Sequence, residues 1–214
     1  LPSIVVTIGT MSLFRGLTQV ILGDQALTHY PQGFLNLGPP SFIPFVQPGV
    51  PWLFVPPVPL SFLIFLVLAA IFGIVLHKTA VGRQLFAIGS NPVAARFSGI
   101  PVDRLRFILF VVSGMLSGLA AALLAARLGS MRSNMAFGWE LDIVTMVILG
   151  GVSIAGGVGS ILGVFLAVLV LGRVTFGMSL NNLPGQVVSV YTGALLIAVI
   201  AIPRIFERIR PRGA

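Results

Sequence analysis

Side chains that could carry out chemistry are scarce in this sequence. It contains five acidic residues, two histidines and no cysteine. Glu140 and Asp142 form a carboxylate pair, but residues at positions i and i+2 do not share a helix face. His29 and His77 have too few acidic residues available to complete a metal site. The pattern therefore predicts neither a catalytic centre nor a metal centre.

Nucleotide-binding motifs are also missing. The single lysine, Lys78, does not belong to the phosphate-binding motif G-x-x-x-x-G-K-[ST]. Gly157 and Gly159 lack the third glycine of the dinucleotide-binding spacing, and they lie in an apolar stretch instead of a strand-to-helix turn. We therefore expect no cofactor, and the chain is predicted not to be an enzyme.

The composition indicates an integral membrane protein. Of the 214 residues, 57% are apolar and 8% are charged, whereas about a quarter are charged in an ordinary soluble domain. The apolar residues form long uncharged blocks, at 53–76, 107–126, 143–172 and 184–203. A helix needs about 20 such residues to cross the hydrocarbon core. This composition excludes a soluble enzyme, a disordered tail and a secreted disulfide scaffold.

The block at 143–172 is too long for one untilted span, and glycines interrupt it at 150–151 and 156–159. Glycine destabilises a helix interior by about 1 kcal/mol relative to alanine. We expect a glycine-rich hairpin with helices near 141–154 and 160–175, whose turn is close to the membrane boundary or partly re-entrant. With a further block at 3–22, the fold class is an all-α polytopic bundle of about six transmembrane helices. It forms one transmembrane domain over residues 1–214.

The basic residues give the orientation. Most of them lie in 77–106 and in the tail 204–214, each beside an apolar block. Because basic loops stay on the cytoplasmic side, the loop 77–106 and the basic tail are predicted to be cytoplasmic. The loop 23–52, rich in proline and glycine, is then an irregular external loop. This distribution argues against nucleic-acid binding despite the net charge of +8. It indicates that the basic residues lie beside the lipid bilayer, which is the expected partner of the chain.

A short helix is predicted inside the cytoplasmic loop. Asn91 is a good N-cap and Pro92 suits the first helical position. Gly99 suits the left-handed residue that ends a helix, and Pro101 blocks continuation. These signals bound a helix over residues 92–98.

A helix of this length is marginal in water, so it is expected to dock against something. Ala94 and Ala95 allow close approach, whereas Phe97 and Ile100 offer apolar anchors. Two interpretations stay open at this point. The helix could contact another protein, or it could be a capped connector that lies against its own bundle.

Three blocks of this sequence resemble the ribose-type branch of the sugar ABC transporter permeases. Residues 89–100 resemble the cytoplasmic coupling loop of that family, and residues 7–17 and 140–160 resemble two further family segments. The blocks occur in family order over most of the chain. The proline-rich outer loop is most similar to the branch that includes rhamnose and autoinducer-2 permeases.

The resemblance implies a permease subunit of an ATP-driven importer for a monosaccharide or related small polar solute, in the bacterial inner membrane. Its partners would be a second permease subunit, a periplasmic solute-binding protein and a cytoplasmic ABC ATPase that hydrolyses the ATP. Because family permeases have more spans, and because the sequence opens at Leu1 without methionine, we expect a C-terminal portion of a longer permease. The residues expected to face the ATPase, including the apolar anchor Phe97, are Asn91, Pro92, Ala94, Ala95, Phe97, Ser98, Gly99 and Ile100.

Three further residues have weaker functional interpretations. Arg15 is the one charge inside the first predicted span, so it either takes part in the pathway or interhelical contacts or extends outward to the interface. Glu140 and Asp142 begin a predicted helix, where the helix dipole favours negative charge. They are also candidates for docking the binding protein. The basic tail anchors the last helix at the anionic leaflet or contacts the ATPase.

Other functions remain as alternatives. A secondary transporter would need charged relays near the midplane, and the spans after Arg15 contain almost no ionisable residue. A membrane enzyme would need a catalytic constellation, which this sequence lacks. A non-functional fragment of a permease is the third alternative.

Overall fold

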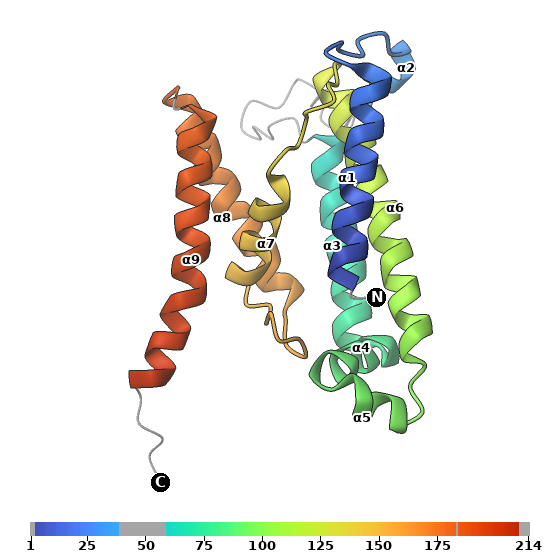
Figure 1. Cartoon of the computed structure of the whole chain (residues 1–214), viewed down its shortest axis with the longest axis vertical. Coiled ribbons are helices and arrows are strands. Elements are labelled where there is room, and N and C mark those ends of the chain that lie inside the picture. The colour runs from blue at the N-terminus through green and yellow to red at the C-terminus, as the bar shows by residue number, and fades with distance from the viewer. Residues whose placement is uncertain (1–2, 39–58, 183, 210–214) are drawn as a thin grey trace, which may run out of the picture. The chain divides into compact units, whose positions relative to one another are not determined.

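The computed structural model describes residues 3–38, 59–182 and 184–209. Within these ranges the chain is helical and contains no β-strand, apart from an isolated bridge between Leu27 and Met131. The all-α fold class is therefore confirmed. The helices (Figure 1) are α1 (Ser3–Leu22), α2 (Gln32–Leu35), α3 (Leu60–Lys78), α4 (Ala80–Ser90), α5 (Pro92–Phe97), α6 (Val102–Leu128), α7 (Trp139–Leu149), α8 (Ile161–Leu180) and α9 (Gly185–Ile209).

Among the described residues, four helices are long and apolar enough to cross a membrane, namely α1, α3, α6 and α8. The helix α9 has 25 residues and contains a shorter apolar stretch, Val190–Val199. The helix α7 has only 11 residues. At about 1.5 Å per residue, it covers roughly half of the 30 Å core. A polytopic helical membrane protein is thus confirmed, whereas the count of six spans stays a prediction.

The chain divides into two compact units, and each is described here by itself. The first unit comprises Leu1–Val67 and Leu109–Phe137, and the second comprises Leu68–Ile108 and Gly138–Ala214. The assignment of residues 1–214 to one permease domain stays a prediction.

In the first unit, the segment that follows α1 is joined to the loop that follows α6. Leu27 and Met131 exchange two backbone hydrogen bonds, with N···O distances of 2.9 and 3.0 Å. Gly38, just after α2, lies against the backbone of Ala126 in α6, so closely that a side chain at Gly38 would collide with it. Within the predicted outer loop, residues 23–38 include the short helix α2. Residues 39–52 of that loop lie outside the described residues.

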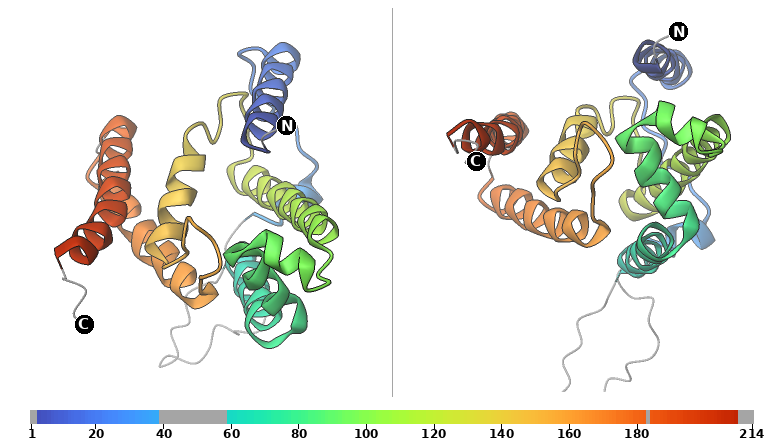
Figure 2. Two further views of the ribbon diagram at one scale, coloured as in Figure 1. Left: turned by 60° about the horizontal axis from the view of Figure 1, so that its bottom comes forward. Right: turned by 90° about the horizontal axis from the view of Figure 1, so that it is seen from below.

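In the second unit, α7 packs against both α8 and α9, and α4 packs against α5 (Figure 2). The loop predicted at 77–106 differs from expectation, because α3 continues to Lys78, α4 fills residues 80–90 and α6 begins at Val102. The helix α4 begins after Thr79, whose side chain accepts a hydrogen bond from the Gly82 N–H at 3.4 Å. Most of the predicted loop is therefore helix.

The glycine-rich hairpin is confirmed, with corrected limits. The first helix ends at Leu149 instead of near residue 154, because Gly151 has a positive φ of 84°. The second helix, α8, continues to Leu180 instead of ending near residue 175. The helix α9 continues through residues 204–209 of the predicted basic tail, and residues 210–214 lie outside the described residues.

Candidate functional site

The helix α5 begins with the predicted cap. The Asn91 Oδ1 atom accepts hydrogen bonds from the backbone N–H groups of Val93 and Ala94, both at 3.0 Å. Pro92 occupies the first turn and Gly99 has a φ of 80°. The helix ends at Phe97, one residue before the predicted end at Ser98. The local signals in the sequence therefore specify this helix.

One face of α5 is buried against its neighbours. Ala95 is only 4% exposed and forms a small core with Ile88 of α4 and Val102 of α6. Ile100 and Leu105 are partly buried against this core. The helix is therefore held by its own unit on this side, as the connector interpretation predicts.

The opposite face of α5 is apolar and exposed. Phe97 is 89% exposed and Val93 is 62% exposed. These residues are four positions apart and therefore share a helix face. Ala94 beside them is exposed as well. A single exposed apolar residue needs no explanation, but this pair lies on a short capped helix whose other face is fixed.

An ion pair joins α5 to the start of α6. The Nη2 atom of Arg96 donates hydrogen bonds to both carboxylate oxygens of Asp103, at 2.8 and 2.7 Å. Both side chains are exposed, so the pair contributes about 0–1 kcal/mol. Asp103 is also favoured by the dipole in the first turn of α6. This pair links α5 to the start of α6, and the sequence signal for it is two opposite charges on either side of the Gly99–Pro101 turn.

In the first unit, Arg15 contacts an aromatic ring. Its guanidinium carbon lies 4.7 Å from the centre of the Phe137 ring, a cation–π geometry. Phe137 belongs to the loop after α6, so Arg15 connects α1 with a distant segment of the chain. A role in the pathway stays a prediction.

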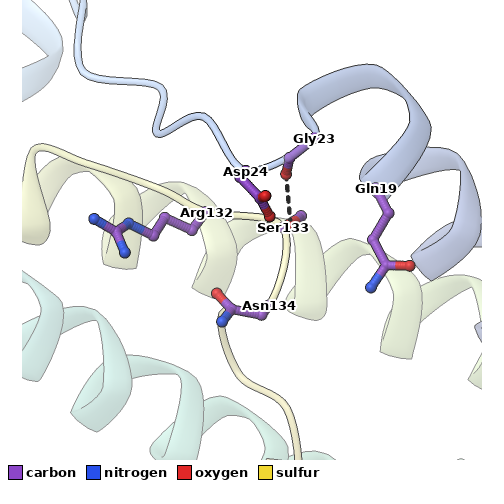
Figure 3. A pocket seen from close by; sticks show the side chains of 6 residues that line it. All are labelled: Gln19, Gly23, Asp24, Arg132, Ser133 and Asn134. Atoms are coloured by element: carbon purple, nitrogen blue, oxygen red, sulfur yellow. Dashed lines mark hydrogen bonds between the residues drawn. The ribbon is translucent and has the colours of Figure 1, made fainter.

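A polar pocket of about 460 Å³ lies near the same loop (Figure 3). The Ser133 hydroxyl donates a hydrogen bond to the Gly23 carbonyl at 3.1 Å. In Figure 3 the Asp24 carboxylate lies beside Ser133, and the Arg132 guanidinium points away from it. The sequence carries no local signal for this pocket, because the two segments are 110 residues apart. The lining residues are Gln19, Gly23, Asp24, Arg132, Ser133 and Asn134.

Comparison with known proteins identifies the family. Residues 1–200 match the family described as "Branched-chain amino acid transport system / permease component". The chain belongs to this permease family. The resemblance predicted from the sequence is thereby confirmed, and so are the multi-pass helical architecture and the inner-membrane location of a bacterial permease.

Among its relatives are three proteins named autoinducer 2 import system permease protein LsrD. They come from Yersinia enterocolitica, Escherichia coli and Shigella flexneri, and each is 40% identical to this permease chain over 199 residues. The alignments cover 92% of this chain but only 57% to 58% of the relatives. The chain thus spans less than two thirds of their length. No solved structure matches it.

The structure divides the residues of this permease that were expected to face the ATPase. Ala95 and Ile100 face the core of their own unit. The others are exposed, namely Asn91, Pro92, Ala94, Phe97, Ser98 and Gly99. Sequence reasoning missed Val93, which its position four residues before Phe97 could have revealed. The contact of these residues with an ATPase stays a prediction.

Glu140 and Asp142 lie in the first turn of α7, and both are half-buried. The N-cap is Gly138, which has no side chain that could cap the helix. The two carboxylates supply the negative charge that a helix N-terminus favours. Their docking to a binding protein stays a prediction. Among the residues that the structure describes, no three histidine, cysteine, aspartate or glutamate side chains gather as a metal site requires.

Proposed function

We propose that this chain is the transmembrane permease part of an ATP-driven importer for a monosaccharide or a related small polar solute. Membership of the permease family supports this proposal. At the level of residues, the proposal is supported by the exposed apolar face of α5, which Val93 and Phe97 form. A secondary transporter has no observation in its favour.

The helix α5 is the element that receives the ATPase. Its buried face, through Ala95, fixes it to α4 and α6, and its exposed face presents Phe97 to the side predicted to be cytoplasmic. An aromatic side chain that enters an apolar pocket of a partner contributes strongly to binding. The partner is a cytoplasmic ABC ATPase, which hydrolyses the ATP.

The solute follows from the relatives. They are named as import permeases for autoinducer 2, and this chain is 40% identical to them over most of its length. We therefore infer a small polar solute of the same kind. A second permease subunit completes the translocation path, and a periplasmic binding protein delivers the solute.

The docking of the binding protein is assigned to polar groups at helix ends on the side predicted to be external. In the second unit, Glu140 and Asp142 begin α7.

The decisive experiment measures recovery of the ATPase with the permease that contains this chain. Phe97→Asp places a charge on the exposed face of α5, and we expect recovery of the ATPase to fall at least about tenfold. The matched control is Val81→Asp, because Val81 is an exposed apolar residue of α4 in the same region. Recovery that is unchanged in the Phe97 variant would contradict the proposal.

A further inference from the structure

The end of α4 and the turn between α7 and α8 meet backbone to backbone (Figure 1). A Cβ atom added at Gly89 would lie 2.5 Å from the Gly157 nitrogen, and one added at Gly156 would lie 2.5 Å from the Gly89 oxygen. One added at Gly157 would collide with the Ser90 hydroxyl. Real Cβ contacts are essentially never shorter than 3.0 Å. Beyond the small side chain of Ser90, no side chain therefore fits between the two segments.

The turn itself is internally braced. The Ser153 N–H donates to the Val158 carbonyl and the Gly156 N–H donates to the Ser153 carbonyl, both at 3.0 Å. Val152 packs against Gly159. Gly156 and Gly157 have φ values of 88° and 76°, which L side chains rarely adopt. Two internal hydrogen bonds and this packing thus hold the turn in one shape.

The residues just after α7, where the turn begins, lie in similarly close contact with α8. A Cβ atom added at Gly150 would lie 2.5 Å from the Val164 Cα atom, and one added at Gly163 would collide with the Gly150 oxygen. The helix α7, which ends at Leu149, packs along both α8 and α9. A continuous line of tight contacts therefore runs from α4 through the turn to the helices of the second unit.

We propose that this contact, formed by Gly89, Ser90, Gly156 and Gly157 and here called the glycine junction, transmits displacement of α5 to α7 and α8. The inference rests on the proposed function of α5. Because Ile88 and Ala95 join α4 to α5 in one core, a movement of α5 carries the end of α4 with it. Because only the small Ser90 side chain lies at this backbone contact, the turn follows that movement directly. Gly89 and Gly157 are positioning residues, which act through the backbone they bring together.

The test uses the permease that contains this chain, assembled with its ATPase and binding protein in proteoliposomes. Gly89 is helical and its φ is not positive. The alanine in Gly89→Ala is therefore compatible with the backbone of α4, and the substitution changes the contact at the glycine junction. We expect normal recovery of the ATPase and continued ATP hydrolysis, but at least a tenfold fall in solute moved per ATP. This ratio does not depend on the amount of protein recovered.

Gly73→Ala is the matched control, because its added Cβ atom would lie 3.9 Å from Ile161 Cγ2, an ordinary contact. We expect it to retain the normal ratio of solute to ATP. Ser90→Val, which enlarges the other side of the junction, should reproduce the Gly89→Ala result. It also serves as the test if the Gly89 variant does not assemble.

The two proposals fail in different ways. If Phe97→Asp leaves ATPase recovery unchanged, the proposed function fails. If Phe97→Asp behaves as expected while Gly89→Ala and Ser90→Val both keep the normal ratio of solute to ATP, the role of the glycine junction is overturned and the proposed function stands.

Discussion

Asn91 satisfies two backbone N–H groups at the start of α5, where a short helix has few other hydrogen bonds. Replacing an N-cap asparagine with alanine costs about 1 kcal/mol. We therefore predict that Asn91→Ala speeds amide hydrogen exchange at Val93 and Ala94 about fivefold. Asn91→Asp keeps an acceptor at the same place and should retain the protection. Equal exchange in the alanine variant would show that the cap is dispensable.

Arg15 and Phe137 make a contact that neither residue's local sequence predicts. A cation–π contact contributes roughly 0.5–1 kcal/mol at an exposed site, and Phe137 is largely exposed. We predict that Phe137→Leu lowers the thermal midpoint of the purified permease by about 1–4 °C. Phe137→Tyr keeps the ring and should match the wild type. A leucine variant as stable as the tyrosine variant would contradict a stabilising contact.

Arg15 itself allows the pathway interpretation to be tested. Arg15→Leu makes α1 more apolar, so membrane insertion should persist. If the guanidinium takes part in the pathway, solute uptake by the complete importer falls while the protein level does not. Unaltered uptake would instead restrict Arg15 to its contact with Phe137.

Among the helices, the close approach of α7 and α8 depends on glycine at one point. An added Cβ atom at Gly163 would collide with the Gly150 oxygen, whereas Gly172 has nothing within 4 Å in the described structure. We predict that Gly163→Ala lowers the thermal midpoint of the permease. Gly172→Ala should leave it unchanged or raise it, because alanine is favoured by about 1 kcal/mol in helices. The opposite order of stabilities would show that α7 and α8 can separate at little cost.

The helices that the sequence predicts best are those with strong local signals. Asn91, Pro92 and Gly99 bound α5 almost to the residue, and the paired glycines locate the break between α7 and α8. The sequence does not predict α4, because Thr79 alone separates it from α3 and because Ile88 packs against residues of later elements. Its formation depends on tertiary contacts, which local propensity does not report.

For the whole molecule, contacts between distant segments were beyond sequence reasoning. The sequence indicates a helical membrane bundle and a short capped helix, but nothing in it pairs Gly89 with Gly157 or Gly23 with Ser133. In the sequence, glycines such as Gly89 and Gly157 indicate only where a helix is weakened or ends. They do not indicate that the two backbone segments lie in contact. The same glycines that predict the hairpin turn therefore also hold it against α4, and only the structure reveals the second property.

The distribution of acidic residues gives a prediction for the energy source. Four acidic residues in the described part of the chain lie in a loop or in the first turn of a helix. They are Asp24, Asp103, Glu140 and Asp142. A proton or sodium relay relies on carboxylate side chains in the interior of the spans, and these four carboxylates lie outside it. We therefore predict that uptake by the reconstituted importer stops without ATP and is unchanged when ionophores remove the ion gradients. Uptake that survives ATP removal and is lost with an ionophore would instead establish a secondary transporter.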